Sequence, residues 1–390
     1  MNAPLAGLRV LELARILAGP WIGQTLADLG ADVIKVEAPA GDDTRRWGPP
    51  FIRTAAGGDG DAAYFHSCNR GKRSIIADYN TAEGRAVVHA LAARADVLIE
   101  NFKVGALQKY ALDYASLRAI NAGLIYCSIT GFGQTGPYAG RSGYDVLIQG
   151  MSGIMDLTGS PEGEPQKIGV ALADICTGLY GVIAIQAALA QRARTGAGQH
   201  IDMALLDTMV AVLANQALNF LVSGTVPHRQ GNSHPNIVPY QVFHASDGPI
   251  IIAVGNDAQF ARLCALLGLD ELAQDPRFVT NSARVAHREI VVSILARRLE
   301  LRARGELLAG LDKAGIPAGP INTVAEAFAD PQVRHRALQR AIAAPWAEGA
   351  SVPSVRTPID FSAAQLQLGR PAPRLGEHTA EILAELGPLS

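Results

Sequence analysis

Residues 8–37 read LRVLELARILAGPWIGQTLADLGADVIKVE, and this stretch decides the fold class. Leu8–Leu13 is a short apolar run typical of a buried strand, and Asp32–Glu37 is predicted to be the next strand. Between them a helical stretch opens at Gly19-Pro20 and ends at Gly30. A helix between two buried strands predicts a parallel pair joined by a crossover, which is the unit of an α/β layer architecture.

The same alternation of strand and helix continues to residue 222. Further strands are predicted at residues 74–79, 96–100, 124–130 and 199–204, and helices at 80–94, 173–194 and 205–222. Asn80 and Glu83 resemble a capping pair for the first of these helices. The helices at 173–194 and 205–222 are apolar nearly all round, which predicts burial in a large core. We therefore expect one large α/β domain over residues 1–222.

A second, smaller domain is predicted at residues 225–325. It begins near a loop at 224–239 that is rich in Gly, His, Asn and Pro, which is typical of a linker or an active-site flap. A hairpin signal at 240–254 follows, with Asp247-Gly248 as its turn, and then helical patterns at 259–267 and 283–314 and a break at 317–320. Residues 330–390 are expected to return to the large domain and to close with a helix near 377–386.

Composition excludes several classes of function. Lys and Arg number 34 and Asp and Glu number 36, so no basic excess indicates nucleic-acid binding. The longest apolar run, residues 175–190, is interrupted by Thr177, Gly178, Gly181 and Gln186, and we expect no membrane span. The four cysteines are far apart and form no CxxC pair, which predicts neither a metal site nor disulfides. No basic, apolar secretory leader opens the chain, and we expect a cytoplasmic protein.

The stretch GFGQTG at residues 131–136 matches the dinucleotide pattern GxGxxG. That pattern binds a pyrophosphate only where a helix begins at the glycines. Here Pro137 follows at once, so we predict a sharply bent loop instead.

Asp174 is the strongest single candidate for chemistry. It ends the stretch KIGVALAD (167–174), just before a helix that is nearly free of charge. One interpretation is a helix N-cap. The other is a nucleophile or base that the helix dipole keeps ionised. Asp145, which follows Tyr144, could equally be a cap at the start of another helix.

Two basic clusters and three histidines are further candidates, and the basic clusters stay open to two interpretations. Arg45 with Arg46, and Arg70 with Lys72 and Arg73, are either solvated or placed to contact phosphate. The spacing of the histidines fits no common metal motif, and we interpret them as loop residues that are hydrogen-bonded or face solvent; they are His228, His234 and His244.

Ten motifs in order support a family resemblance over essentially the whole chain. They are VLELARILAGP (10–20), LGADVIKVEAP (29–39), GDDTR (41–45), NRGKRSI (69–75), VLIENF (97–102), GFGQTGPY (131–138), GYD (143–145), the Asp174 segment, TGAGQ (195–199) and LGEHT (375–379). With these motifs the chain resembles the class III CoA-transferases, the CaiB/BaiF family that includes formyl-CoA transferase.

The resemblance implies a fold, a substrate and a mechanism. The implied fold is a Rossmann-like large domain plus a smaller α/β domain, with two protomers interlocked as a ring dimer. CoA thioesters are substrates, no prosthetic group is required, and the family's catalytic aspartate falls on Asp174. Its carboxylate would form aspartyl anhydride and aspartyl-CoA thioester intermediates. The CoA contacts implied by the family positions are Ile16, Leu17, Ala18, Asn101, Phe102, Ala106 and Lys109, and we add Arg45, Arg73, Tyr144 and Asp145 as further candidates.

The resemblance also narrows the substrate. Formyl-CoA transferase has a glutamine where this chain has Leu17 and an arginine where it has Ala38. The segments GNSHPNIVPYQVF (231–243) and VGNDAQF (254–260) are most similar to the succinate–hydroxymethylglutarate (glutarate) CoA-transferase branch. This points to succinyl-CoA as the donor and to a dicarboxylic acid such as glutarate as the acceptor. His234, Asn236 or Arg45 could bind the distal carboxylate of that acid.

Two other functions are compatible with parts of the pattern. The α-methylacyl-CoA racemases share the fold but use a histidine with the aspartate, and Tyr144 stands at that position while His244 stands at that of their glutamate. A tyrosine, with a pKa of about 10, is a poor general base at neutral pH. A non-catalytic CoA-binding subunit would have lost the aspartate, and Asp174 is present.

Overall fold

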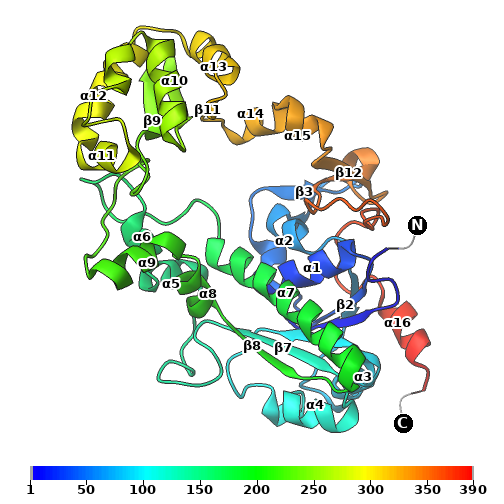
Figure 1. The fold of residues 1–390 in the computed structure, drawn as a ribbon. Coiled ribbons are helices and arrows are strands. Elements are labelled where there is room, and N and C mark those ends of the chain that lie inside the picture. The colour runs from blue at the N-terminus through cyan, green and yellow to red at the C-terminus, as the bar shows by residue number, and fades with distance from the viewer. Residues whose placement is uncertain (1–2, 389–390) are drawn as a thin grey trace. The chain divides into compact units, whose positions relative to one another are not determined.

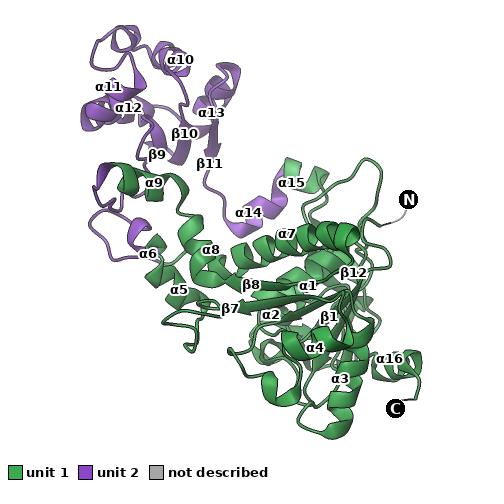
Figure 2. Ribbon diagram, turned by 60° about the horizontal axis from the view of Figure 1, so that its bottom comes forward, with its two compact units in different colours: residues 1–154, 167–222, 331–390 green, residues 155–166, 223–330 purple. Residues whose placement is uncertain are grey.

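The chain divides into two compact units. The computed structural model describes residues 3–388. Unit 1 comprises residues 1–154, 167–222 and 331–390, and unit 2 comprises residues 155–166 and 223–330 (Figure 2). The short segment 155–166 therefore leaves unit 1 and joins unit 2, where Arg229 binds the Asp156 carboxylate with an N···O distance of 2.7 Å.

Unit 1 is built on a six-stranded sheet in which all the strands are parallel (Figure 1). In spatial order they are β5 (Arg73–Ile76), β2 (Asp32–Glu37), β1 (Arg9–Glu12), β6 (Val97–Glu100), β7 (Ile125–Thr130) and β8 (His200–Ala204). The predicted strands are all present, and the bounds of β2 are those expected. The order runs outward in both directions from β1, so the direction of winding reverses between β1 and β6.

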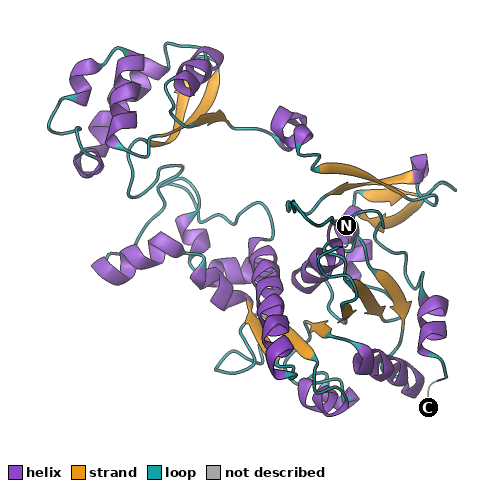
Figure 3. Ribbon diagram, turned by 45° about the vertical axis from the view of Figure 1, so that its right-hand side comes forward, coloured by secondary structure: helices purple, strands orange, loops and turns teal. Residues whose placement is uncertain are grey.

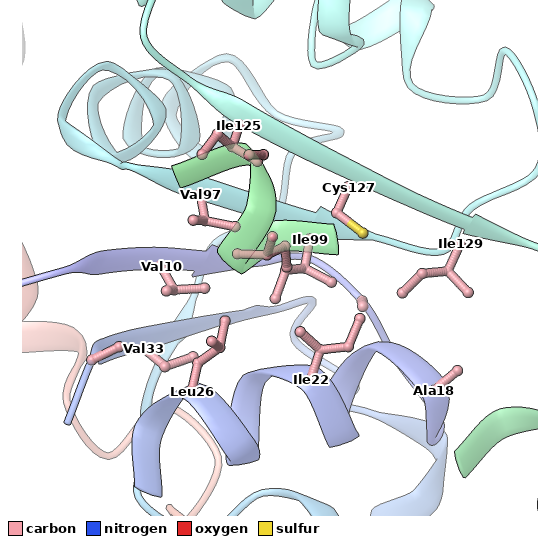
Figure 4. Packing of buried hydrophobic residues seen from close by; sticks show 14 of the residues in the cluster. Val10, Ala18, Ile22, Leu26, Val33, Val97, Ile99, Ile125, Cys127 and Ile129 are labelled. Atoms are coloured by element: carbon pink, nitrogen blue, oxygen red, sulfur yellow. The ribbon is translucent and has the colours of Figure 1, made fainter. Parts of the chain in front are cut away.

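Helices cover both faces of this sheet because side chains in a strand alternate between the two faces. Val10 and Leu11 of β1 illustrate the alternation: Val10 packs with helix α1 and Leu11 with helix α3. Figure 4 shows the first face, where strand residues such as Val10, Val97 and Ile99 meet Ile22 of α1. This face carries α1 (Ala18–Asp28), α5 (Asp145–Met151), α7 (Leu172–Thr195) and α8 (Leu205–Ala211), and the other carries α3 (Ala82–Arg94), α4 (Tyr114–Ile120) and α16 (Thr379–Leu386).

Shorter elements complete unit 1, and most of them lie in segments that the sequence left unassigned. They include two antiparallel hairpins, β3–β4 and β12–β13. The elements are η1 (Asp43–Arg46), β3 (Phe51–Arg53), β4 (Asp59–Ala62), α2 (Ala63–Cys68), η2 (Gln108–Tyr110), α9 (Ala214–Ser223), α15 (Pro331–His335), β12 (Gln339–Ala343), η4 (Glu348–Ala350) and β13 (Ser351–Val355). Helix α6 (Ile154–Leu157) belongs to unit 2 except for its first residue.

Unit 2 is a three-stranded antiparallel sheet packed against helices (Figure 3). Ile250 and Ile252 are buried whereas Ile251 between them is exposed, which is the alternation of a half-buried strand. The elements are β9 (Tyr240–Ala245), β10 (Gly248–Ala253), α10 (Asp257–Leu267), η3 (Asp270–Ala273), α11 (Asn281–Ala286), α12 (Arg288–Leu299), α13 (Arg304–Lys313), β11 (Ala318–Pro320) and α14 (Val324–Ala329).

Several local expectations were wrong. The cap of α3 is Thr81, whose hydroxyl accepts from Gly84 N–H, and not the pair Asn80 and Glu83. The hairpin turn is Ser246-Asp247, one residue before the predicted one. The break expected at 317–320 contains the edge strand β11, and the pattern at 283–314 forms three helices.

The apolar segment 205–222 is two helices and not one. Ala214, with φ of +47°, bends the chain by 72° between α8 and α9, although neither Gly nor Pro marks the site. Helix α9 has no buried residue. The predicted burial is therefore confirmed in part for α8, where Leu205 and Met209 are buried, and is wrong for α9.

Helix α7 is long and apolar enough to cross a membrane by length and composition, contrary to the expectation that no segment is. It packs against α1, α5 and α8 and against strands of the sheet, and this packing accounts for part of its apolar surface. Burial is less complete than predicted, because Leu179, Tyr180 and Ile183 are exposed.

Candidate active site

A pocket lies where parallel strands β1 and β6 end. Ligands of open α/β sheets bind outside the carboxyl ends of the strands, at the point where the winding reverses. The pocket of about 400 Å³ occupies that place. It is lined by Arg15, Ile16, Leu17, Ala18, Asn101, Phe102, Lys103, Val104, Ala106, Ile129, Thr130, Gly131, Ala139, Arg141, Ser142, Gly143, Tyr144, Asp174 and Leu205.

The structure brings together most of the predicted site residues in this pocket. The segment after β1 and the segment after β6 both line the pocket, and the start of α7 contributes Asp174. The predicted residues that line it are Ile16, Leu17, Ala18, Asn101, Phe102, Ala106, Tyr144 and Asp174. The amide side chain of Asn101 is also structural, because it accepts from Arg15 N–H at 2.9 Å and donates to the Arg15 carbonyl at 2.6 Å.

Asp174 is not the cap of its helix. The N-cap position of α7 is Ala171, and the capping carboxylate comes from Asp145, the first residue of α5. Its Oδ1 accepts from Ala173 N–H at 2.8 Å and from Asp174 N–H at 3.4 Å, while Gln149 donates to its Oδ2 at 2.7 Å. Asp145 is therefore a cap, as one alternative had it, but of α7 rather than of its own helix.

This arrangement changes the expected ionisation of Asp174. Burial, and then the negative charge of Asp145, raise the pKa of the Asp174 carboxyl to about 7. The helix dipole was expected to keep Asp174 fully ionised. With a pKa of about 7, the carboxyl is instead partly protonated at neutral pH. A carboxylate with a raised pKa is more basic and hence a better nucleophile when it is ionised.

Four predicted CoA contacts lie outside the pocket lining, and one of them is Asp145, the cap of α7. Arg45 is buried, and its guanidinium pairs with Glu37 (2.6 Å) and Asp61 (2.6 Å). Arg73 stands at the amino end of β5, the opposite edge of the sheet, where it pairs with carboxylates; these are Asp32, Glu381 and Glu385. The ammonium of Lys109 lies 4.6 Å from the centre of the Tyr110 ring.

Sequence reasoning missed the basic side chains that do line the pocket. Arg15, Lys103 and Arg141 belong to the lining, and Arg15 stacks over the Phe102 ring at 5.5 Å. Arg15 and Lys103 follow β1 and β6 within a few residues, so their place after two strand ends was the available signal. Three cations at one pocket favour an anionic ligand such as a phosphate ester.

The glycine-rich loop is a turn, as predicted, and forms one wall of the pocket. A Cβ atom on Gly131 would lie 2.6 Å from the Cα atom of Gly143, so neither position has room for a side chain. This close backbone approach brings Ser142, Gly143 and Tyr144 to the end of β7.

The predicted flap belongs to unit 2 and is held by hydrogen bonds within that unit. Arg288 donates to the carbonyl oxygens of His234 and Pro235, both at 2.9 Å, and Asn281 donates to that of Asn236 at 2.9 Å. Burial and the Arg288 charge lower the pKa of His234. Among residues 3–388 no group of three or more His, Cys, Asp or Glu side chains is placed to hold a metal ion.

Comparison with known proteins gives concordant matches over the whole chain. Residues 5–379 match the model of CoA-transferase family III. A succinate–glutarate CoA-transferase of Agrobacterium fabrum is 58% identical over 98% of this chain and 96% of that protein. A human succinyl-CoA:glutarate CoA-transferase is 42% identical over 98% of this chain and 86% of that protein. The crystal structure of a CaiB/BaiF family protein from Brucella suis aligns with a TM-score of 0.87 at 64% identity, covering 99% of this chain and 100% of that one.

Proposed function

Because the chain belongs to CoA-transferase family III, we propose that it moves CoA from succinyl-CoA to glutarate. The observation that carries the proposal is Asp174 in a pocket that also holds three cationic side chains. The identities to the two glutarate transferases support the choice of donor and acceptor. The predicted flap, residues 231–243, points to the same substrates.

The proposed reaction is a double displacement on the Asp174 carboxyl. The carboxylate oxygen attacks the thioester carbon of succinyl-CoA, and CoA leaves as a thiolate, which gives a mixed anhydride. The thiolate attacks the Asp174 carbonyl carbon and succinate leaves, which gives the aspartyl-CoA thioester. Glutarate then attacks this thioester to form a second anhydride, and the thiolate takes the glutaryl group and frees Asp174.

The site geometry suits this chemistry in two ways. Asp174 lies in the first turn of α7, where the helix dipole stabilises the negative charge that is present before attack. Its partial burial withdraws the carboxylate from water, which strengthens it as a nucleophile. The carboxylate and the CoA thiolate supply both nucleophiles, so the proposed reaction needs no prosthetic group.

We place the CoA phosphates near Arg15, Lys103 and Arg141, with the thioester reaching toward Asp174. The pocket lining supports this orientation. The three cationic side chains come from loops, whereas Asp174 comes from the first turn of helix α7. The order of the six parallel strands supports the Rossmann-like description of the large unit.

Two further features of the proposal concern assembly and location. Exposed apolar side chains gather on α7, α8 and α9, and we propose that a second copy covers them in the ring dimer of the family; they are Leu179, Tyr180, Ile183, Val210, Leu218, Phe220, Leu221 and Val222. The four cysteines are free thiols, which supports a cytoplasmic location.

The experiment that tests the chemistry is intact mass spectrometry of the protein after incubation with succinyl-CoA. Wild type should gain the mass of CoA, hydroxylamine should remove it, and Asp174→Ala should gain nothing. Asp113→Asn, which alters a carboxylate that caps α4 outside the pocket, should gain the adduct like wild type. Absence of the adduct from wild type, with racemisation of a 2-methylacyl-CoA instead, would overturn the proposal.

A further inference from the structure

The backbone of Ile16 adopts an unusual conformation at the edge of the pocket. Its φ is +73°, in the left-handed region, which a β-branched residue adopts only at a cost of roughly 1–3 kcal/mol. Ile16 connects the end of β1 to the start of α1 and lines the pocket. A strained residue at a ligand site persists where its surroundings impose the conformation.

Side chains from three other segments bind the backbone here. The Ile16 N–H donates to the carboxylate of Asp42, with N···O distances of 3.3 and 3.4 Å. The thiol of Cys68 donates to the Ile16 carbonyl at 3.5 Å. Asn101 binds both the N–H and the carbonyl of Arg15. Residues 15 and 16 are thus held at all four of their backbone polar groups.

Asp42 is in turn fixed by a buried ionic network. The Lys35 ammonium lies 3.0 Å from Asp42 Oδ2 and 3.1 Å from Glu12 Oε1, and Lys72 lies 2.8 Å from Glu12 Oε2. Thr44 donates to Asp42 Oδ1 through its N–H (3.0 Å) and its hydroxyl (2.8 Å).

The network keeps Asp42 ionised. Burial alone would raise the pKa of Asp42, but Lys35 and Thr44 outweigh it and hold the pKa below its ordinary value.

Stability alone is a weak reason for such a network. The side chains of Glu12, Lys35 and Lys72 are completely buried, and removing charges from water costs about as much as their attraction returns. Through Asp42, however, the network binds the backbone N–H of Ile16, the pocket residue with the strained conformation. The presence of the network is therefore better explained by its hold on the Ile16 backbone than by a contribution to stability.

We propose that Asp42 is a positioning residue that holds Ile16 in the left-handed conformation and so sets the first turn of α1 against Asp174. Leu17 and Ala18, which follow Ile16, line the pocket together with Asp174. The first N–H groups of a helix have no partner within the helix, so this turn presents donors to the reacting group. The inference rests on the covalent role of Asp174 proposed above.

The test uses Asp42→Asn, which preserves shape but removes the charge that faces Lys35 and puts an amide among donors. We expect the rate of CoA adduct formation in a single turnover to fall by about 10- to 100-fold, because a misplacement of about 1 Å can cost that much. The KM for succinyl-CoA should change by less than about threefold, because the cationic lining residues are untouched.

The matched control is Asp28→Asn. Asp28 is an equally buried carboxylate, bound by Arg70 (2.9 Å to Oδ1) and by the Thr357 hydroxyl, and it does not line the pocket. It should lower the melting temperature about as much as Asp42→Asn but leave the single-turnover rate within about twofold of wild type, as expected of a purely structural change. Equal kinetic losses in the two variants would overturn the positioning role.

A double-mutant cycle with Ile16→Gly isolates the mechanism. Glycine adopts a positive φ without strain and does not need Asp42 to impose it. The effect of Asp42→Asn on the rate should therefore shrink at least threefold in the Ile16→Gly background. An unchanged effect would overturn the proposal.

If Asp42→Asn does not fold, Thr44→Val, which removes one donor to Asp42, should lower the rate about threefold and show the same dependence on Ile16. Failure of wild type to form any adduct would instead contradict the proposed function, so the two failures are distinguishable.

Discussion

At the scale of single residues, Asp145 and Asp174 form a pair in which one carboxylate positions and tunes the other. Asp145 caps α7, and its charge, together with burial, raises the pKa of Asp174 to about 7. Both effects require the first residue of α5, Asp145, to lie at the amino end of α7. The sequence indicated two aspartates 29 residues apart, but only the fold shows that they meet.

This pair predicts the pH dependence of the reaction. The attacking form of Asp174 is the carboxylate, so the rate of adduct formation at low succinyl-CoA should rise as the pH rises through about 7 and then level off. Asp145→Asn removes the negative neighbour but keeps a side-chain oxygen for the cap. It should therefore lower the pKa of Asp174 and move the inflection to lower pH.

Single-turnover rates from pH 5.5 to 8.5 would measure both profiles. Asp113→Asn, the cap of α4, should leave the inflection in place. A flat wild-type profile, or an inflection that moves to higher pH in Asp145→Asn, would contradict this account of the pair.

Residue identity at the site was predictable only where a short motif carried it. The segments ending in Ile16, Leu17 and Ala18 and in Asn101 and Phe102 follow strands, and both reach the pocket. Arg45 and Arg73 are also basic and near strands, yet both side chains are buried and paired with carboxylates of the same chain, which are themselves exposed in the case of Arg73. The sequence does not show which cations reach the pocket, and this is why Arg15, Lys103 and Arg141 were missed. Arg15 lines the pocket although its guanidinium also pairs with Asp43 at 3.4 Å.

At the scale of elements, helix α1 lies directly over the buried charges of β1. A Cβ atom on Gly23 would lie 1.8 Å from Glu12 Oε2, so α1 can approach the sheet this closely only with glycine at that position. Helix α1, which follows Ile16, is therefore in direct contact with Glu12 of the ionic network that fixes Asp42.

Two glycine-to-alanine substitutions in helices should have opposite effects. Gly23→Ala should destabilise unit 1 by about 1–3 kcal/mol, because the new methyl group overlaps the carboxylate of Glu12 and displaces it from its ion pairs. Gly305→Ala in α13 meets no atom within 4 Å and should stabilise unit 2 by about 1 kcal/mol through helix propensity. Scanning calorimetry of both variants beside wild type would measure the shifts, and unchanged stability of Gly23→Ala would refute the close approach of α1.

Elements with strong periodicity were predictable, and elements set by tertiary contacts were not. The main strands of residues 8–130 appear where expected because each has a core of apolar residues, such as Val10 and Leu11 in β1. The bend at Ala214 and the short strands β3, β4, β12 and β13 have no such signal. Their conformations depend on pairing with segments that local sequence does not specify.

At the scale of the whole molecule, the family could be predicted because ten motifs occur in one order, whereas assembly was implied by resemblance alone. The structure adds an independent reason for assembly. Ile183 on α7 is 62% exposed and Leu221 on α9 is 73% exposed, and apolar side chains this exposed support the proposal that a second copy covers these helices.

If a second copy covers this surface, a charge placed on it should separate the copies. Wild type should sediment with the mass of a dimer, and Ile183→Asp should shift the population toward the monomer by at least tenfold in dissociation constant, because burying an unpaired carboxylate costs more than about 1.4 kcal/mol. Ile120→Asp is the matched control, since Ile120 is 50% exposed at the end of α4 and lies on none of these three helices. Analytical ultracentrifugation over a dilution series would distinguish the variants. A monomeric wild type, or equal dissociation in both variants, would show that the exposed face of α7 does not join two copies.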